Sequence, residues 1–468
     1  MKKVLSTVAA LALVAGVASN AMALDKPGRA SEVPATTAPR VPVPTAPGVA
    51  LWSVAGQWVL AGALINGGMG DGAPGSSSAA GGADVQGIHD NTDAFYIYSF
   101  KILPVLQVND KISVKGELRF ADRCIFGKDC GSESGDRDMD IKHVFMEWTS
   151  PIGKTRFGRT PAGGWGTKFM DNGAQGDRLM LWPNFMPDNW GALLFTQKIT
   201  ENDATTPGVS DGDVDGYYVD LNYTADFGKT IAAVFAKRTA DNTAINDSLI
   251  ATQLWVTGNY KFGDFGVVWE WNQAFGDGDP EPGFTEESDA SGTGIMLDLN
   301  YQMDDWTFGG LFFYMTGDDD ITDNDTESLF GSKGVGNDYN PYQILTGDYM
   351  GLLQGDKSTG GAHSALFNGP GDHSVSGVIS IGGYVKFAVS PKLSVNAAVG
   401  YAGADEEPDG FDDDYGIEFG VGAAYKIMDN LSYNAHFSFL STGDYWDEGG
   451  TMDTEDVYLI AHALSMKF

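Results

Sequence analysis

Apolar and polar residues alternate at every second position over much of this chain. In residues 112–120, which read ISVKGELRF, one face carries apolar side chains and a glycine, and the other carries a serine and three charged side chains. A period of two residues is typical of a β-strand with two different faces. The same pattern recurs in the segments 52–66, 94–107, 111–126, 138–149, 154–160, 192–199, 217–226, 251–262, 265–275, 295–302, 306–315, 376–389, 392–403, 415–428, 431–442 and 457–468. With a weaker segment near 178–183 and the strand expected after Gly228-Lys229, the pattern predicts about 18 strands, with 16 as the nearest alternative.

Short and long connections between these strands alternate along the chain. The short ones have turn chemistry, as in Asn109-Asp110 and Asp429-Asn430, whereas the long ones are polar and acidic, as in 201–215 and 318–373. An outer-membrane barrel has this arrangement, with tight periplasmic turns and long outer loops. Hydrocarbon cannot satisfy a sheet edge, so the sheet must close. The prediction is an all-β, closed antiparallel transmembrane barrel, wide enough to hold an aqueous channel.

The first 50 residues differ from the rest. Lys2-Lys3, an apolar run and the small residues around Met22 are typical of a secretory signal, which we expect to span residues 1–23. Residues 24–50 are rich in proline, alanine and threonine, and we expect an extended periplasmic linker there. The barrel is expected over residues 51–468.

Charge and cysteine content narrow the function. The formal net charge of −34 argues against a nucleic-acid partner, which would require clustered lysine and arginine. Cys124 and Cys130 are the only cysteines, and in an exported chain they favour a disulfide that closes a short loop.

The chain ends in VYLIAHALSMKF, with alternating apolar residues and a terminal aromatic, Phe468. This end resembles the C-terminal assembly signal of outer-membrane barrels. Together with the signal sequence and the alternation, it makes the chain similar to the Gram-negative porins, and most similar to the trimeric porin group. The most local match is Gly158-Arg159, which precedes a long connection after the fifth predicted strand.

That resemblance implies a homotrimer that associates through the first and last strands, and a loop, residues 161–177, that folds inward and constricts the pore. His462 faces lipid by the parity of the last strand, where a polar group is costly, so we expect it in a subunit contact. A register break or a position near the rim are the alternatives.

A charged constriction is the main site hypothesis. The family match places Arg159 inward and Arg156 near the periplasmic rim. Facing charges would sort solutes by size and charge; the alternative is that these are ordinary solvated lumen residues. The residues expected at the constriction are Lys115, Glu117, Arg119, Arg159, Trp165, Lys168 and Asp171.

Catalysis and cofactors find little support in the sequence. His143 and Glu147 share a strand face, but nothing marks a nearby serine or threonine as an activated nucleophile, so no catalytic residue and no cofactor is predicted. An acidic cluster could bind calcium or bridge to lipopolysaccharide phosphates, or simply keep an outer loop soluble. Its residues are Asp318, Asp319, Asp320, Asp323 and Asp325.

The expected function is passive diffusion of small hydrophilic solutes and ions across the outer membrane, with lipid and lipopolysaccharide as neighbours. A channel specific for a sugar or a carboxylate, the barrel sheath of an electron conduit, and a barrel hydrolase remain as alternatives. Loop 318–373 is longer than a simple connection requires, which suggests a lid or a specificity element.

Overall fold

The computed structural model describes residues 51–66, 93–126, 139–161, 167, 169, 175–201, 213–239, 250–278, 288–318, 327, 342–346, 376–407, 411–447 and 455–468. These contain eighteen strands and one short 3₁₀ helix, η4 (Asp444–Asp447). The strands are β1 (Leu51–Asn66), β2 (Asp93–Gln107), β3 (Ile112–Ile125), β4 (Asp140–Ser150), β5 (Gly153–Pro161), β6 (Gln175–Pro183), β7 (Trp190–Thr200), β8 (Val214–Ala225), β9 (Gly228–Thr239), β10 (Ile250–Phe262), β11 (Phe265–Gly278), β12 (Ser288–Met303), β13 (Trp306–Met315), β14 (Val378–Ser390), β15 (Leu393–Gly403), β16 (Asp414–Met428), β17 (Leu431–Thr442) and β18 (Val457–Lys467). The predicted signal and linker lie outside the described residues, and no helix among the described residues is long and apolar enough to cross a membrane.

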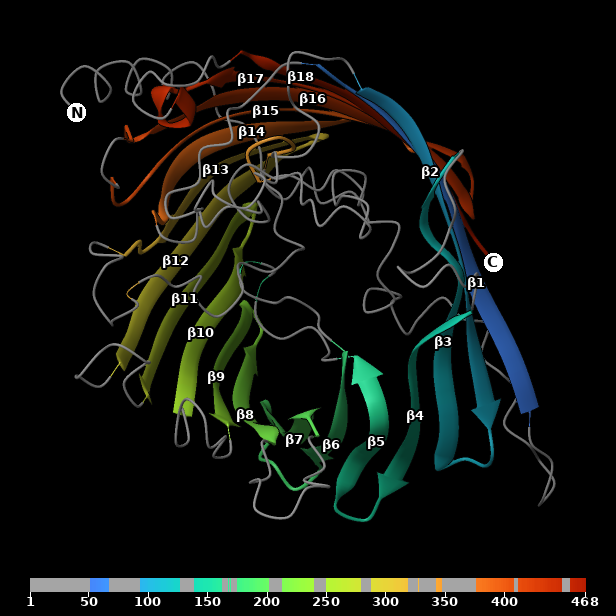
Figure 1. The fold of residues 1–468 in the computed structure, drawn as a ribbon. Helices are drawn as coiled ribbons and strands as arrows, with labels where there is room; N and C mark the ends of the chain where they lie inside the picture. The colour runs from blue at the N-terminus through green and yellow to red at the C-terminus, as the bar shows by residue number, and fades with distance from the viewer. Residues whose placement is uncertain are drawn as a thin grey trace, which may run out of the picture.

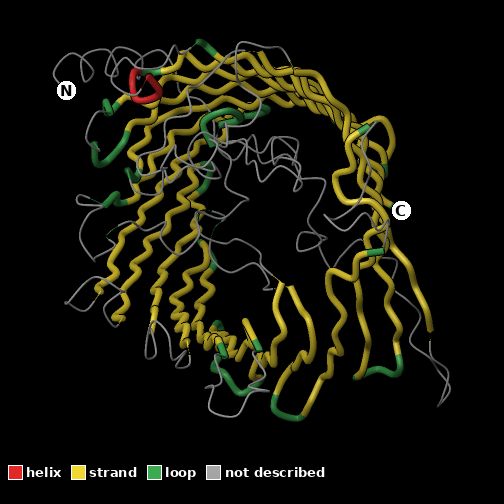
Figure 2. The backbone as a smooth tube through the Cα atoms, in the orientation of Figure 1, coloured by secondary structure: helices red, strands yellow, loops and turns green. Residues whose placement is uncertain are grey.

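The strands form one closed sheet. Each strand pairs antiparallel with the next strand in the chain, and β18 pairs with β1 to complete the ring (Figure 1). The trace in Figure 2 shows strand around the whole wall, with η4 as a single helical turn beside it. The prediction of a closed antiparallel barrel of about 18 strands is confirmed.

Two strand boundaries correct the sequence-based expectations. β6 begins at Gln175, so the connection after β5 is shorter than the expected 161–177, and Asp177 lies on a strand rather than in the loop. β12 begins at Ser288, seven residues before the predicted start, because serine, glycine and threonine hid its N-terminal part from the apolar pattern.

Alternate residues face opposite sides of the wall, and the outer side is apolar. In β18, Tyr458 and Ile460 are 44% and 50% exposed on the outer face, whereas Leu459 and Ala461 are fully buried on the inner face. Exposed leucine, valine, isoleucine and aromatic side chains continue this outer surface around the barrel. Such a surface would be unfavourable in water and is what a lipid-facing band requires.

The ring closes at the C-terminal residue. Phe468 exchanges two backbone hydrogen bonds with Gly56 of β1, at 2.8 and 3.0 Å. The Phe468 ring also lies on Gly56, where an added Cβ would come within 2.3 Å of it, and stacks against Phe100 with centroids 6.3 Å apart. The terminal aromatic therefore closes the barrel by packing on a glycine.

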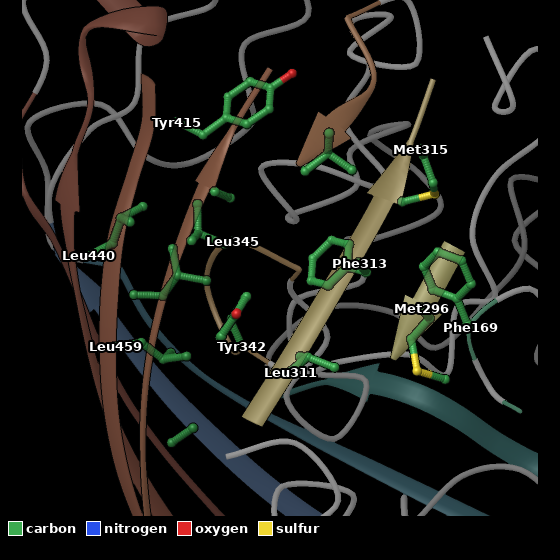
Figure 3. Close-up of a cluster of buried hydrophobic side chains, with 14 of the residues drawn as sticks. Phe169, Met296, Leu311, Phe313, Met315, Tyr342, Leu345, Tyr415, Leu440 and Leu459 are labelled. Atoms are coloured by element: carbon green, nitrogen blue, oxygen red, sulfur yellow. The ribbon is translucent and has the colours of Figure 1, made fainter. Parts of the chain in front are cut away.

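Buried apolar side chains form a cluster inside the wall of the barrel. Figure 3 shows Phe169 beside Met296 and Phe313, with Tyr342 and Leu345 closer to the last strands. Phe169 and residues 342–346 belong to the two connections that follow β5 and β13, so both connections reach the interior.

Candidate functional site in the barrel lumen

The inner face of β2–β4 carries a buried charge cluster. Glu117 on β3 is fully buried, and its Oε1 lies 2.6 Å from Arg119 Nε and 3.8 Å from Lys101 Nζ. Glu117 pairs across the sheet with His143 of β4. Glu117 Oε2 and His143 Nδ1 are buried without a hydrogen-bond partner among the described residues. The cluster thus holds two cations on a single carboxylate.

A second ion pair network lies nearer the short-turn end of the same wall. Lys115 Nζ donates to Glu147 Oε1 and Arg156 Nε donates to Glu147 Oε2, each at 2.8 Å. Glu147 therefore bridges β3 and β5 through β4. The alternation in the sequence correctly placed Lys115 and Glu147 on the lumen face. The ion pair between Glu147 and Arg156 was not predicted.

The orientation predicted for the two arginines of β5 is wrong. Arg156 lies directly opposite Glu147, on the lumen face, whereas Arg159 lies opposite Val144, an outward residue that is 51% exposed. On its other side Arg159 is paired with Asp177 of β6. The family match fixed only the position of Arg159 in the sequence; the cross-strand register fixes its face, and that register assigns the lumen to Arg156.

Aromatic side chains hold the cations of β5 and β6. Lys154 Nζ and Arg156 Cζ lie 4.4 and 4.9 Å from the centre of the Trp182 ring on β6, and Arg156 also lies 5.0 Å from the Phe145 ring. A cation over an aromatic face is attracted by the quadrupole of the ring. Trp182 was not anticipated, although its position two residues from Met180 on the weakly predicted sixth strand was a signal for it.

Arg178 extends this arrangement to β7. Its guanidinium lies 5.1 Å from the Phe195 ring, and its Nε donates to Gln197 Oε1 at 2.8 Å. Phe195 in turn stacks on Tyr218 of β8 at 4.5 Å and an interplanar angle of 11°. Cations and rings therefore alternate along the inner wall from β5 to β8.

The connection after β5 contacts the opposite wall. Thr167 donates through its backbone N–H, at 2.9 Å, and through its hydroxyl to Glu270 Oε2 of β11. Phe169 is fully buried, with its ring centroid 6.2 Å from that of Phe313 on β13. Thr167 and Phe169 therefore lie inside the barrel, in contact with β11 and β13 rather than with β5, the strand that precedes them. Trp165, Lys168 and Asp171, expected at the constriction, lie outside the described residues.

The connection after β13 also binds the wall, through residues 342–346, which we call the lumen turn. The carboxylate of Glu418 on β16 accepts three backbone N–H groups, from Gln343 at 2.8 Å, Ile344 at 3.0 Å and Leu345 at 2.9 Å. Glu418 is 2% exposed. A carboxylate that receives three N–H groups is strongly held, since hydrogen bonds to a charged group are about twice as strong as neutral ones.

Tyr342 anchors the other side of the lumen turn. Its ring lies over Gly400 and its hydroxyl over Gly382, which pair across β14 and β15, and a Cβ on either glycine would come within 2.4 Å of the tyrosine. The Ser380 hydroxyl donates to a backbone carbonyl at 2.7 Å, so the Tyr342 hydroxyl donates to Ser380 at 3.1 Å. Burial raises the pKa of the Tyr342 phenol, which keeps this donor protonated.

Apart from Glu117, the buried charges of opposite sign lie on different strands of the described wall. The buried cations, Lys101 and Arg178, lie on β2 and β6. The buried carboxylates outside the Glu117 cluster lie on β8, β11, β12 and β16; they are Asp220, Glu270, Asp298 and Glu418. Charges separated in this way produce a field across the interior.

The remaining predicted site residues have mixed outcomes. Cys124 is disulfide-bonded, while Cys130 lies outside the described residues. Of the calcium candidates only Asp318 is described, and among the described residues no group of three or more metal-binding side chains occurs. His462 lies on the outer face, opposite Gly62, with its ring 5.7 Å from Tyr96 and 5.8 Å from Tyr433.

Solved structures with a similar fold include outer-membrane proteins and porins of bacteria. OccAB4 of Acinetobacter baumannii matches with a TM-score of 0.49 at 10% identity, covering 89% of this chain and 98% of that one. The anion-selective porin of Comamonas acidovorans matches with a TM-score of 0.40 at 12% identity, covering 90% and 100%. The described strands of the chain form a closed antiparallel barrel. OccK8 (OprE) of Pseudomonas aeruginosa gives a TM-score of 0.49 at 8% identity, covering 89% and 98%. No family model matches the chain, and no curated protein does.

Proposed function

We propose that this chain is an outer-membrane channel for passive diffusion of small hydrophilic solutes and ions. One observation carries the proposal: a closed barrel that is apolar outside has charged side chains on its inner wall, and Lys115, Glu147 and Arg156 among them are partly exposed. Charged groups on the inner face of a barrel are expensive unless water or an ion reaches them. A water-filled lumen is the simplest environment for them.

Two connections would narrow that lumen. Thr167 and Phe169 contact β11 and β13, and the lumen turn contacts β14 and β16, so solutes would pass between these segments and the basic inner wall of β2–β6. The charged residues of that wall would then select solutes by charge and size. The same contacts disfavour the electron-conduit alternative, which needs a lumen free of inward segments.

The placement in the cell follows from the same features. The apolar outer surface would contact lipid, and the long connections would face lipopolysaccharide. A homotrimer through β1 and β18 remains a proposal, supported by the outer-face position of His462 beside that seam.

Single-channel recording tests the proposal. The purified chain, reconstituted in planar bilayers in KCl, should produce stable ohmic conductance steps without any added energy source. Steps should persist on replacement of K⁺ or Cl⁻ by other small ions, with a reversal potential that reports the charge selectivity. A folded, inserted barrel that gives no current would refute the proposed function.

A further inference from the structure

We propose that Arg159 and Asp177, on the outer face of β5 and β6, bind the headgroup of a lipid that carries both a phosphate and an ammonium, as phosphatidylethanolamine does. The two residues are direct cross-strand partners. Because Arg159 points away from the lumen, its side chain has no part in the proposed conduction. The inference therefore concerns the lipid contact of the barrel and does not depend on whether the barrel passes current.

A row of alternating charges crosses the outer face of five consecutive strands. Each residue of the row is the direct cross-strand partner of the next, and each lies within two residues of a strand end that adjoins a long connection. In order, they are Arg159, Asp177, Lys198, Asp215 and Arg238. Two residues further into β6 and β8, Leu179 and Tyr217 are 58% and 47% exposed. The row thus lies where the apolar outer surface ends, which is the level of lipid headgroups.

The first two residues of the row have charges that the described protein leaves unpaired. Arg159 and Asp177 are both exposed, and neither forms a salt bridge with any described residue. Lys198, the other cross-strand partner of Asp177, is instead bound elsewhere, with its Nζ 3.0 Å from Asp215 and 3.4 Å from Glu201. A surface salt bridge between Arg159 and Asp177 would contribute little, so a ligand could replace it at small cost.

The two side chains match the two charges of a phosphoethanolamine headgroup. A guanidinium binds a phosphate through two parallel N–H groups, and a carboxylate accepts the N–H groups of an ammonium. Directly opposite residues of antiparallel strands have Cα atoms roughly 4.5–5.5 Å apart, so the two side chains can reach two charges that only a short linker separates. A headgroup with a phosphate alone would be repelled by Asp177. A choline headgroup has a positive charge but no N–H group to donate.

The surroundings of the pair favour a lipid over a second copy of the chain. Leu179 beside Asp177 and Val144 beside Arg159 are 58% and 51% exposed, so acyl chains below the headgroup would meet apolar side chains. The subunit contact proposed above lies at β1 and β18, and β2, β3 and β4 separate β5 from it. The outer face of β5 and β6 would therefore remain in contact with lipid in an oligomer as well.

Native mass spectrometry of the full-length folded barrel tests the proposal, with phosphatidylethanolamine, phosphatidylglycerol and phosphatidylcholine added one at a time. The wild type should bind phosphatidylethanolamine about tenfold more tightly than the other two lipids, the value of one charge-assisted hydrogen bond. Arg159→Gln and Asp177→Asn should each abolish this preference. Arg238→Gln is the matched control, since Arg238 lies in the same row but its partner Asp215 is already bound to Lys198, and it should keep the preference.

The possible outcomes separate the proposal from general lipid binding. All variants change exposed residues, and unheated gels show that each is folded. Equal binding of the three lipids by the wild type, or the same loss in Arg159→Gln and Arg238→Gln, would overturn the proposal. Equal binding of phosphatidylethanolamine and phosphatidylglycerol, lost in Arg159→Gln but kept in Asp177→Asn, would show a site for phosphate alone and would also overturn it.

Discussion

Replacing Glu418 by alanine should release the lumen turn. The substitution removes the carboxylate that the N–H groups of Gln343, Ile344 and Leu345 bind at 2.8–3.0 Å. A buried N–H without a partner costs about 1–3 kcal/mol, so three would cost about 3–9 kcal/mol if the turn stayed in place. Entry of water lowers that value, and about 3 kcal/mol at the lower end still changes the ratio of docked to undocked turn about 150-fold.

Glu418→Gln should have an intermediate effect, because the two carboxylate oxygens accept different numbers of backbone hydrogen bonds from the lumen turn. Oε2 accepts from the N–H groups of Ile344 and Leu345, and Oε1 accepts from the N–H group of Gln343. The carbonyl oxygen of a glutamine can take the place of Oε2 and accept from Ile344 and Leu345. The side-chain NH2 group then faces the backbone N–H of Gln343, so that one N–H group loses its acceptor. The expected cost is therefore roughly a third of that for alanine, about 1–3 kcal/mol.

Limited proteolysis measures the release. Tyr342 is 1% exposed, so chymotrypsin should not cleave after it in the folded wild-type barrel and should do so in Glu418→Ala, with the new terminus identified by mass spectrometry. Glu270→Ala is the matched control: it removes the carboxylate that binds Thr167, so it should expose Phe169 to cleavage and leave Tyr342 protected. Equal protection of Tyr342 in wild type and Glu418→Ala, in barrels that both run as folded species on unheated gels, would refute the reasoning.

Four further substitutions test the wall and the seam. Arg156→Gln should shift the reversal potential toward cation selectivity in a KCl gradient, whereas Arg159→Gln, on the outer face, should leave it within error of wild type. Gly56→Val should slow barrel assembly in detergent at least severalfold, because its side chain would displace the Phe468 ring. His462→Ala should lower the temperature at which an oligomer dissociates on gels by several degrees.

Each of these tests has a distinct negative result. Equal reversal potentials for the two arginine variants would show that the lumen wall does not set selectivity. Normal assembly of the valine variant would show that barrel closure does not require the Phe468 ring to pack on Gly56. An unchanged oligomer in the histidine variant would exclude a subunit contact at that position.

The sequence was sufficient for the fold because a barrel repeats one local rule. Alternation assigns each residue of a strand to one of two faces, and it placed Lys115, Glu117 and Arg119 together on the lumen side, as the structure does. The alternation could not show which face of β5 lines the lumen, because β5 carries arginine at both 156 and 159, which point to opposite faces. Only the cross-strand pairing of Arg156 with Glu147 shows that Arg156 faces the lumen.

The contacts of the inward segments could not be predicted from the sequence. Glu270 and Glu418 alternate with apolar residues like any other lumen position, and nothing near them in sequence indicates a partner. Their partners, Thr167 and Ile344, lie about 100 and 75 residues away in connections without periodicity. Such contacts depend on the closed shape of the barrel, which brings distant connections to the same wall.

The pairing of Gly56 with Phe468 also has a kinetic consequence. Every other strand pairs with its neighbour in the chain, so a hairpin can form as soon as its two strands are available, but this pair joins residues about 410 positions apart. The entropy of closing so long a loop costs about 5 kcal/mol, and the whole of this cost arises in the single step that pairs β1 with the C-terminal residue. Until the last residue arrives, β1 keeps a free hydrogen-bonding edge that invites aggregation. The free edge of β1 must therefore be kept from aggregating until the C-terminal residues have paired with it.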